Sequence, residues 1–264
     1  MSEDATIVDI NNGVATITLN QPDLRNALTE DIALGLLEAL EEVEGSTARC
    51  VVIEGADGAF SAGGDINAMV EGLEGEIPLE ERVQHIVETT GKAIARVYKF
   101  SLPTIAKIEG PAFGAGANLA IACDIQLASE SSQISFGFRQ VGLAVDAGTS
   151  YLLPRIVGEN TAQELVLTGE LLTASRAEQL GLFNHVYPEE QFDEQVEEFV
   201  DEIATGPTVA LRASTRLIRQ GLDQSVEDAL HDEAAAQAAV FETQDHEEGV
   251  SAFKDRRNPN FEGK

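Results

Sequence analysis

The chain has 264 residues, 43% of them hydrophobic, and 46 acidic residues against 17 basic ones give a net charge of −29. Its length suffices for one large domain with a substantial core, and no uncharged apolar run is long enough to indicate a membrane protein. The charge disfavours nucleic-acid binding, because phosphates would meet a repelling surface. Residues 1–4 are acidic and lack a basic-then-apolar signal pattern, so we expect a cytoplasmic protein.

The acidic residues are distributed along the whole chain rather than gathered in one tail. Acid-rich stretches occur at residues 38–44, 71–81, 189–202 and 245–248. A distributed excess of this size is typical of a solvated surface adapted to concentrated salt, so we expect a halophilic, salt-accumulating host. Two isolated cysteines, Cys50 and Cys123, and four scattered histidines show no metal-binding spacing, so no metal site is expected.

The first residues predict a hairpin followed by a helix. Two β-branched runs, at residues 6–10 and 14–19, flank Asn12-Gly13, the dipeptide typical of a tight hairpin turn. Thr29 can cap the next segment, in which apolar residues recur at helical spacing.

A buried strand at residues 50–53 is followed by a turn of small residues that opens a helix. The turn reads Ala59-Phe60-Ser61-Ala62-Gly63-Gly64-Asp65-Ile66. Beyond it, residues 71–79 are rich in glycine and acid and predict a mobile loop, and residues 83–97 predict the next helix.

The same pattern recurs after a second buried strand, at residues 105–108. The chain continues Gly110-Pro111-Ala112-Phe113-Gly114-Ala115-Gly116-Ala117-Asn118-Leu119-Ala120, with a helix expected from Asn118 onward. Small side chains let a ligand approach the main chain, and the first amides of a helix lack partners. Close helix–strand packing would also explain these glycines. Two such turns, however, favour a pair of converging amides that binds a developing negative charge.

Past the second turn the chain alternates strands and short helices and then becomes helical throughout. We expect strands at residues 125–128, 134–138 and 183–187, and helices at residues 147–155, 174–180, 188–203, 209–222, 226–241 and 249–257. The loss of strand signals predicts a core of residues 1–200 and a helical region of residues 201–264. Those helices pack either on their own core or against another subunit.

The two turns resemble the two signature segments of the enoyl-CoA hydratase/isomerase (crotonase) superfamily. The resemblance extends to Leu19-Asn20-Gln21-Pro22, Arg25-Asn26-Ala27-Leu28 and Phe253-Lys254-Asp255-Arg256-Arg257. It implies an α/β crotonase-like spiral of ββα units with a C-terminal all-helical trimerisation region, assembled as a homotrimer or as a hexamer of two trimers. It also implies an acyl-CoA substrate, with no cofactor beyond the coenzyme A moiety of that substrate.

The resemblance also implies roles for individual residues. The amides of Gly64 and Ala115 would hold the thioester oxygen, since an enolate needs preorganised donors. The residues expected to bind the coenzyme A moiety are Arg25, Ala27, Ser61, Ala62, Asp65, Ile66, Lys254 and Arg256, the last of which could come from a neighbouring subunit. Alternatively, the two C-terminal cations form an ordinary basic helix end.

The acid–base positions favour one reaction of the superfamily. Its hydratases activate a water with two glutamates, but the matching positions hold Asn118 and Phe138, which cannot act as general bases. Asp146 resembles the single aspartate of the 1,2-epoxyphenylacetyl-CoA isomerase and Δ3,Δ2-enoyl-CoA isomerase branch, although Thr149 replaces a glycine frequent there. Asp146 could instead cap a helix. We therefore expect an isomerase that shifts a double bond in an enoyl-CoA thioester, or that opens an aryl-epoxide thioester as in phenylacetate catabolism.

Three other functions stay open from the sequence. One is an enoyl-CoA hydratase of fatty-acid β-oxidation that uses Asp146 alone. Another is an outlying reaction of the superfamily, such as thioester hydrolysis, dehalogenation or decarboxylation. The third is a non-catalytic scaffold that binds acyl-CoA. The acyl group is not predicted, because residues 67–82 and the C-terminal helices would form the pocket walls.

Overall fold

A computed structural model describes residues 4–75 and 77–264 and is organised around a six-stranded sheet. Its strands, in the spatial order β1-β2-β3-β4-β6-β9, are β1 (Thr6–Asn11), β2 (Val14–Leu19), β3 (Cys50–Gly55), β4 (Thr104–Ile108), β6 (Ile125–Ser129) and β9 (His185–Tyr187). β1 and β2 form the predicted antiparallel hairpin, and the other neighbouring strands pair in parallel. Because β3 and β4 are parallel neighbours, the turns that follow them leave the same edge of the sheet.

A second, smaller sheet lies where those two turns leave the first. It contains β5 (Pro111–Phe113), β7 (Gln133–Ser135) and β8 (Leu172–Thr173) in the order β5-β7-β8. An isolated parallel bridge also joins Ser61 to Ala112, so the turn after β3 pairs with the turn after β4.

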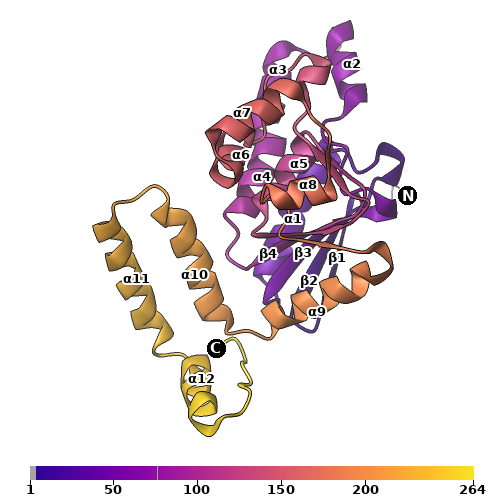
Figure 1. Cartoon of the computed structure of the whole chain (residues 1–264). Coiled ribbons are helices and arrows are strands. Elements are labelled where there is room, and N and C mark those ends of the chain that lie inside the picture. The colour runs from indigo at the N-terminus through magenta and orange to yellow at the C-terminus, as the bar shows by residue number, and fades with distance from the viewer. Residues whose placement is uncertain (1–3, 76) are drawn as a thin grey trace.

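Nine α-helices and one π-helical turn, Ile86–Thr90, pack around the sheets in the described part of the core. The helices are α1 (Glu30–Glu44), α2 (Ile66–Glu74), α3 (Leu79–His85), α4 (Gly91–Tyr98), α5 (Ala115–Ala122), α6 (Thr149–Val157), α7 (Glu159–Thr168), α8 (Ala174–Gln179) and α9 (Phe192–Ala204). Every residue of α5 is buried, which makes it the central helix of the main core. α9 covers the opposite face of the sheet, where Phe192 and Val196 pack on residues of β3, β4 and β6 (Figure 1).

Three further helices extend away from this core. They are α10 (Thr208–Gly221), α11 (Val226–Val240) and α12 (Gln244–Asp255). Figure 1 shows α10 and α11 side by side as a hairpin that projects from the sheets, with α12 beyond them. The projecting helices leave apolar side chains in solvent, including Ile218 at 72% exposure and Phe253 at 89%. No helix among the described residues is both long enough and apolar enough to cross a bilayer.

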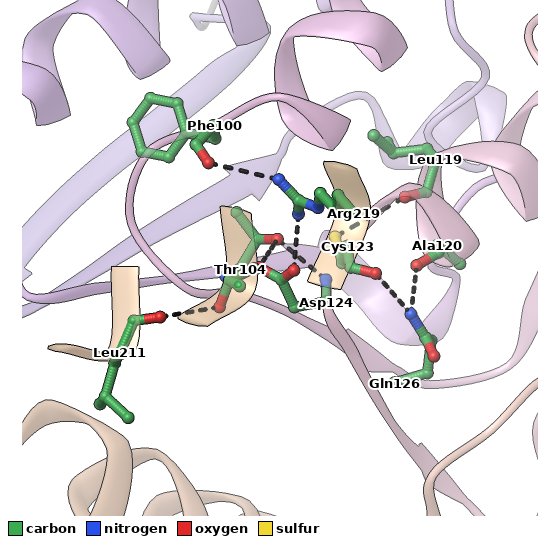
Figure 2. A network of polar contacts seen from close by, with 10 residues as sticks. Phe100, Thr104, Leu119, Ala120, Cys123, Asp124, Gln126, Leu211 and Arg219 are labelled. Atoms are coloured by element: carbon green, nitrogen blue, oxygen red, sulfur yellow. Dashed lines mark hydrogen bonds and ion pairs between the residues drawn. The ribbon is translucent and has the colours of Figure 1, made fainter. Parts of the chain in front are cut away.

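An ion pair anchors α10 to the core at the end of β4 that lies away from the two turns. Figure 2 shows the Arg219 guanidinium pointing at the Asp124 carboxylate, with Nη2 and Oδ1 2.5 Å apart. The same carboxylate accepts hydrogen bonds from the amide and the hydroxyl of Thr104, at 2.9 and 3.0 Å. Both side chains of the ion pair are largely buried, so this junction holds α10 in a defined direction.

Several boundaries differ from the sequence-based expectation. α5 begins at Ala115 rather than at the expected Asn118, because its first turn consists of small residues without the apolar spacing that predicts a helix. α2 continues to Glu74, so the first half of the loop expected at residues 71–79 is helical, whereas Glu76 lies outside the described residues. Phe138 lies in the 3-10 turn Phe138–Val141 instead of a strand, and α7 was not predicted.

Candidate active site

The turns after β3 and β4 are joined through their backbones. The amide of Ser61 donates to the carbonyl of Pro111 at 3.0 Å, and the amide of Phe113 donates to the carbonyl of Ser61 at 2.9 Å. Ser61 is completely buried, and its Oγ accepts a hydrogen bond from the Gly63 amide at 3.2 Å. The observed contacts of this serine therefore hold the two turns together.

Two glycines allow this close approach. A Cβ atom on Gly63 would lie 2.3 Å from the carbonyl oxygen of Phe113, and one on Gly116 would lie 2.6 Å from the side chain and carbonyl of Ser61. Atoms without a bond between them do not come so close. Gly63 also has φ +91°, a conformation that side chains with a Cβ rarely adopt. The sequence pattern of small residues is therefore explained by contact between the two turns.

The joined turns present two unpaired amides. Ala115 is the first residue of α5, and Gly64 precedes α2 by two residues. A Cβ atom on Gly63 would lie 3.4 Å from the Ala115 nitrogen, so the two turns meet at these residues. Within residues 4–75 and 77–264, neither the Gly64 nor the Ala115 amide donates a hydrogen bond. Such amides can stabilise an oxygen that gains negative charge during a reaction.

Asp146 lies on the loop that leads into α6, and its carboxylate forms no polar contact with the described residues. The residue is half-buried, and its carboxylate has no hydrogen-bond or ion-pair partner among the described residues. Burial raises the pKa of this carboxyl above its ordinary value, because the charged form loses solvation. The alternative that Asp146 caps the following helix is wrong, since the cap position of α6 is Gly148, at φ +88°, and no side chain caps it.

Asn118 connects the Asp146 loop to α5. Asn118 is completely buried, and its Nδ2 donates to the main-chain carbonyl of Asp146 at 3.1 Å and to Oγ1 of Thr149 at 2.7 Å. It lies about one helical turn beyond Ala115 on α5. The Asp146 loop therefore lies against α5, the helix that begins with the unpaired amide of Ala115.

Phe138 occupies the second of the two positions at which hydratases of the superfamily are expected to carry glutamate, and this position is apolar and packed. The ring of Phe138 is 8% exposed, and its Cζ would lie 4.0 Å from a Cβ atom on Gly114. The structure thus has a phenyl ring beside the start of α5.

The first group of expected coenzyme A-binding residues lies around the joined turns. The amide of Ala62 donates to the carbonyl of Arg25 at 2.9 Å, and the amide of Leu28 donates to that of Gly63 at 2.7 Å, so the two segments are neighbours. Arg25 and Ile66 are exposed, whereas Ala27 is buried. The Asp65 carboxylate is used as a helix cap, since its Oδ1 accepts from the Asn67 amide at 2.8 Å.

The second group lies elsewhere in the chain. Lys254 is in the last turn of α12, and Arg256 follows it with φ +55°. Figure 1 shows α12 at the opposite end of the molecule from α2, which directly follows the first turn. The structure of one chain therefore does not bring these two cations to the joined turns.

Met69 is a neighbour of the joined turns that no sequence pattern indicated. A Cβ atom on Gly64 would lie 2.7 Å from the terminal methyl group of Met69, so this methyl covers Gly64. The residue is half-buried on α2, one helical turn after its cap. The sequence could have indicated this contact only indirectly, because a glycine that lets a ligand approach the backbone also leaves room for a flexible side chain over it.

Known proteins resemble this chain over nearly its whole length. A profile of the family described as "Enoyl-CoA hydratase/isomerase" matches residues 9–264. A provisionally assigned enoyl-CoA hydratase of Thermus thermophilus is 37% identical, covering 97% of this chain and 100% of that protein. The 1,2-epoxyphenylacetyl-CoA isomerase of Escherichia coli is 32% identical, covering 97% of each. The crystal structure of an enoyl-CoA hydratase from Bacillus anthracis superposes with a TM-score of 0.91 at 30% identity, covering 98% of this chain and 100% of that one.

Proposed function

Because this chain belongs to the enoyl-CoA hydratase/isomerase family, we propose that it is an isomerase that shifts a double bond in an enoyl-CoA thioester. The observation that carries the proposal is the unpartnered, half-buried carboxylate of Asp146, held against the helix that begins with the open amide of Ala115. Titratable groups whose pKa is raised by burial are frequent at catalytic sites. A single carboxylate can carry out isomerisation, which needs no activated water.

The proposed reaction moves one proton and one electron pair. The Asp146 carboxylate takes a proton from the carbon between the thioester and the double bond of a 3-enoyl-CoA. The electron pair moves into the thioester, whose oxygen accepts hydrogen bonds from the Gly64 and Ala115 amides. Asp146 then returns the proton to carbon 4, which gives the 2-enoyl-CoA. Removing one such amide donor typically costs about 10²–10³-fold in rate, and removing a general acid–base about 10²–10⁴-fold.

Hydration of a 2-enoyl-CoA is the second candidate function. It is supported by names among the relatives, such as the 2,3-dehydroadipyl-CoA hydratase of Escherichia coli, which is 32% identical to this chain. Against it, both hydrogens of the Asn118 amide are already donated within the protein, and Phe138 has no polar atom. Hydration would therefore depend on Asp146 alone.

The coenzyme A moiety is proposed to bind along the segments at Arg25–Leu28 and Ser61–Ile66, beside the open amides. In this proposal Lys254 and Arg256 come from a neighbouring copy of the chain, because they lie far from these segments in their own chain (Figure 1). A homotrimer, or two paired trimers, would supply that neighbour.

Proton NMR in high-salt deuterated buffer tests the proposed function directly. The enzyme is incubated with a 3-enoyl-CoA and, separately, with a 2-enoyl-CoA. We expect the 3-enoyl substrate to become 2-enoyl-CoA without formation of 3-hydroxyacyl-CoA. Rapid formation of 3-hydroxyacyl-CoA from the 2-enoyl substrate would favour the hydratase, and coenzyme A-ester binding without any exchange of the α-proton would favour a non-catalytic scaffold.

A further inference from the structure

We infer that Asn118 and Thr149 are positioning residues, which fix the main chain of Asp146 so that its carboxylate is held ready for proton transfer. The inference rests on the proposed role of Asp146 and adds the part of the chain that orients it. Neither residue is proposed to touch the substrate.

The contacts form a closed network around one carbonyl. The carbonyl oxygen of Asp146 accepts hydrogen bonds from Nδ2 of Asn118 at 3.1 Å and from the main-chain amide of Thr149 at 2.9 Å. The Thr149 hydroxyl accepts from Asn118 at 2.7 Å and lies 2.9 Å from both the Asp146 carbonyl and Oδ1 of Asn118. Asn118 is completely buried and Thr149 is 1% exposed, so water does not compete for these bonds.

The backbone beside Asp146 requires such support. Ala147 has φ +48° and Gly148 has φ +88°, so two left-handed residues directly follow the aspartate. Alanine rarely adopts this conformation, and such residues persist only where their surroundings hold them. The network is also confined to the main chain of Asp146, and the carboxylate itself has no partner in residues 4–75 and 77–264. This arrangement fixes the position of the acid–base group and keeps its oxygens available.

Substitutions at Thr149 test whether its hydroxyl positions Asp146. Thr149→Val keeps the shape of the side chain and removes the hydroxyl. We expect kcat for 3-enoyl-CoA isomerisation to fall by about 10- to 100-fold, because a displacement of about 1 Å can cost two orders of magnitude. KM should stay within about twofold, since the site for the coenzyme A ester is untouched. Thr149→Ser, which keeps the hydroxyl, should restore kcat to within about threefold of the wild type.

A double variant distinguishes a positioning role from a structural one. Asn118→Leu combined with Thr149→Val replaces both polar side chains with apolar ones, so no buried amide is left unpaired. Tm of the double variant should therefore be closer to the wild-type value than Tm of Thr149→Val alone. We expect kcat to stay low in this stable variant. Recovery of kcat together with Tm would overturn the inference.

A control variant removes a comparable hydroxyl at the other end of the core. Thr104 is completely buried, and its hydroxyl donates to Asp124 at 3.0 Å, at the start of β4 rather than beside the turn that follows it. Thr104→Val should lower Tm and leave kcat near that of the wild type. An equal loss of kcat in Thr104→Val and Thr149→Val would contradict a specific role for the network.

Crystal structures of the wild type and of Thr149→Val test the inference without any assay of turnover. We expect the Asp146 main chain to move or to occupy more than one conformation in the variant. An unchanged Asp146 loop would overturn the positioning role. If the wild type does not isomerise 3-enoyl-CoA, the proposed function fails, and these structures still decide whether the network holds the loop.

Discussion

At the scale of single residues, the proposed chemistry depends on the environment of the Asp146 carboxylate. It is half-buried and has neither a hydrogen-bond donor nor a cation as a partner among the described residues, so burial is the cause that raises its pKa. A base with a raised pKa holds an abstracted proton more strongly, and it can return that proton as the acid of the second step. In the proposed mechanism the amides of Gly64 and Ala115 complement it, because main-chain donors do not titrate.

The raised pKa predicts the pH dependence of the reaction. The carboxyl must be ionised to abstract a proton, so kcat/KM should fall as the pH is lowered through the pKa of Asp146 in the free enzyme. Because burial raises this pKa, the midpoint of the fall should lie above that of an ordinary aspartate. Steady-state rates measured between about pH 3 and pH 8 check this. A midpoint at or below the ordinary aspartate value would contradict the environment described for Asp146.

The sequence could suggest roles for these residues but not their contacts. Roles are predicted for Asp146, Gly64 and Ala115 because the segments around them resemble motifs of the family. The bond from Asn118 to Thr149 joins residues 31 positions apart, and no local pattern records such a contact. For the same reason, the sequence left open whether Asp146 caps a helix. The structure decides against it, because the cap residue of α6 is Gly148 and no side chain of the described residues caps that helix end.

At the scale of elements, the two small-residue turns act as one unit because α5 packs directly on Ser61. Gly116 is the contact point, since any Cβ there would lie 2.6 Å from the side chain and carbonyl of Ser61. The separation between α5 and the first turn therefore sets the distance between the two open amides.

Gly116→Ala tests this coupling. The added methyl group must push α5 away from Ser61, and overpacking of this kind costs about 1–3 kcal/mol. We expect Tm to fall by several degrees and kcat/KM to fall at least tenfold, because the two amides no longer converge. Thermal unfolding and isomerisation rates check both effects.

Gly45→Ala is the matched control for this substitution. Gly45 has negative φ and space for a Cβ atom, which would make an ordinary contact of 3.6 Å with the Glu42 carbonyl. We expect this variant to behave like the wild type. Normal activity in Gly116→Ala would show that the spacing of the turns does not matter.

Most elements were predicted close to their observed bounds, including the polar helices α8 and α11, but the start of α5 and the whole of α7 were not. The hairpin, the helix capped by Thr29 and the strand β3 were all confirmed. α5 was expected three residues too late because its first turn contains only alanine, glycine and asparagine before Leu119. α7 was missed because much of its first half is polar, and its helix is stabilised by packing on α6.

At the scale of the whole molecule, the charge of −29 predicts a dependence on salt. Like charges repel across the surface, and salt screens them, since the Debye length falls from about 10 Å at 0.1 M to about 3 Å at 1 M. We expect Tm to rise as KCl is increased over this range, measured by circular dichroism. Sucrose serves as the uncharged control. Full stability and activity without molar salt would contradict a halophilic origin.

The projecting helices predict an oligomer. Their exposed apolar residues, among them Ile218 on α10 and Leu230 on α11, would be covered by neighbouring copies. We expect light scattering to give a mass three or six times the 28.2 kDa of one chain. Leu230→Glu should reduce that mass, whereas Leu167→Glu, at an exposed position on α7 of the core, should not. A monomeric wild type would contradict the proposed supply of Lys254 and Arg256 by a neighbour.

Asp146→Asn tests whether Asp146 is the acid and base of a double-bond isomerase. Asparagine keeps the shape of the side chain and removes its acidity. We predict that conversion of 3-enoyl-CoA falls by about 10²–10⁴-fold, whereas the Kd for a coenzyme A ester, measured by calorimetry, changes little. Tm at neutral pH should not fall, because the variant no longer buries a charge. An Asp146→Asn enzyme that isomerises at the wild-type rate would contradict this role of Asp146.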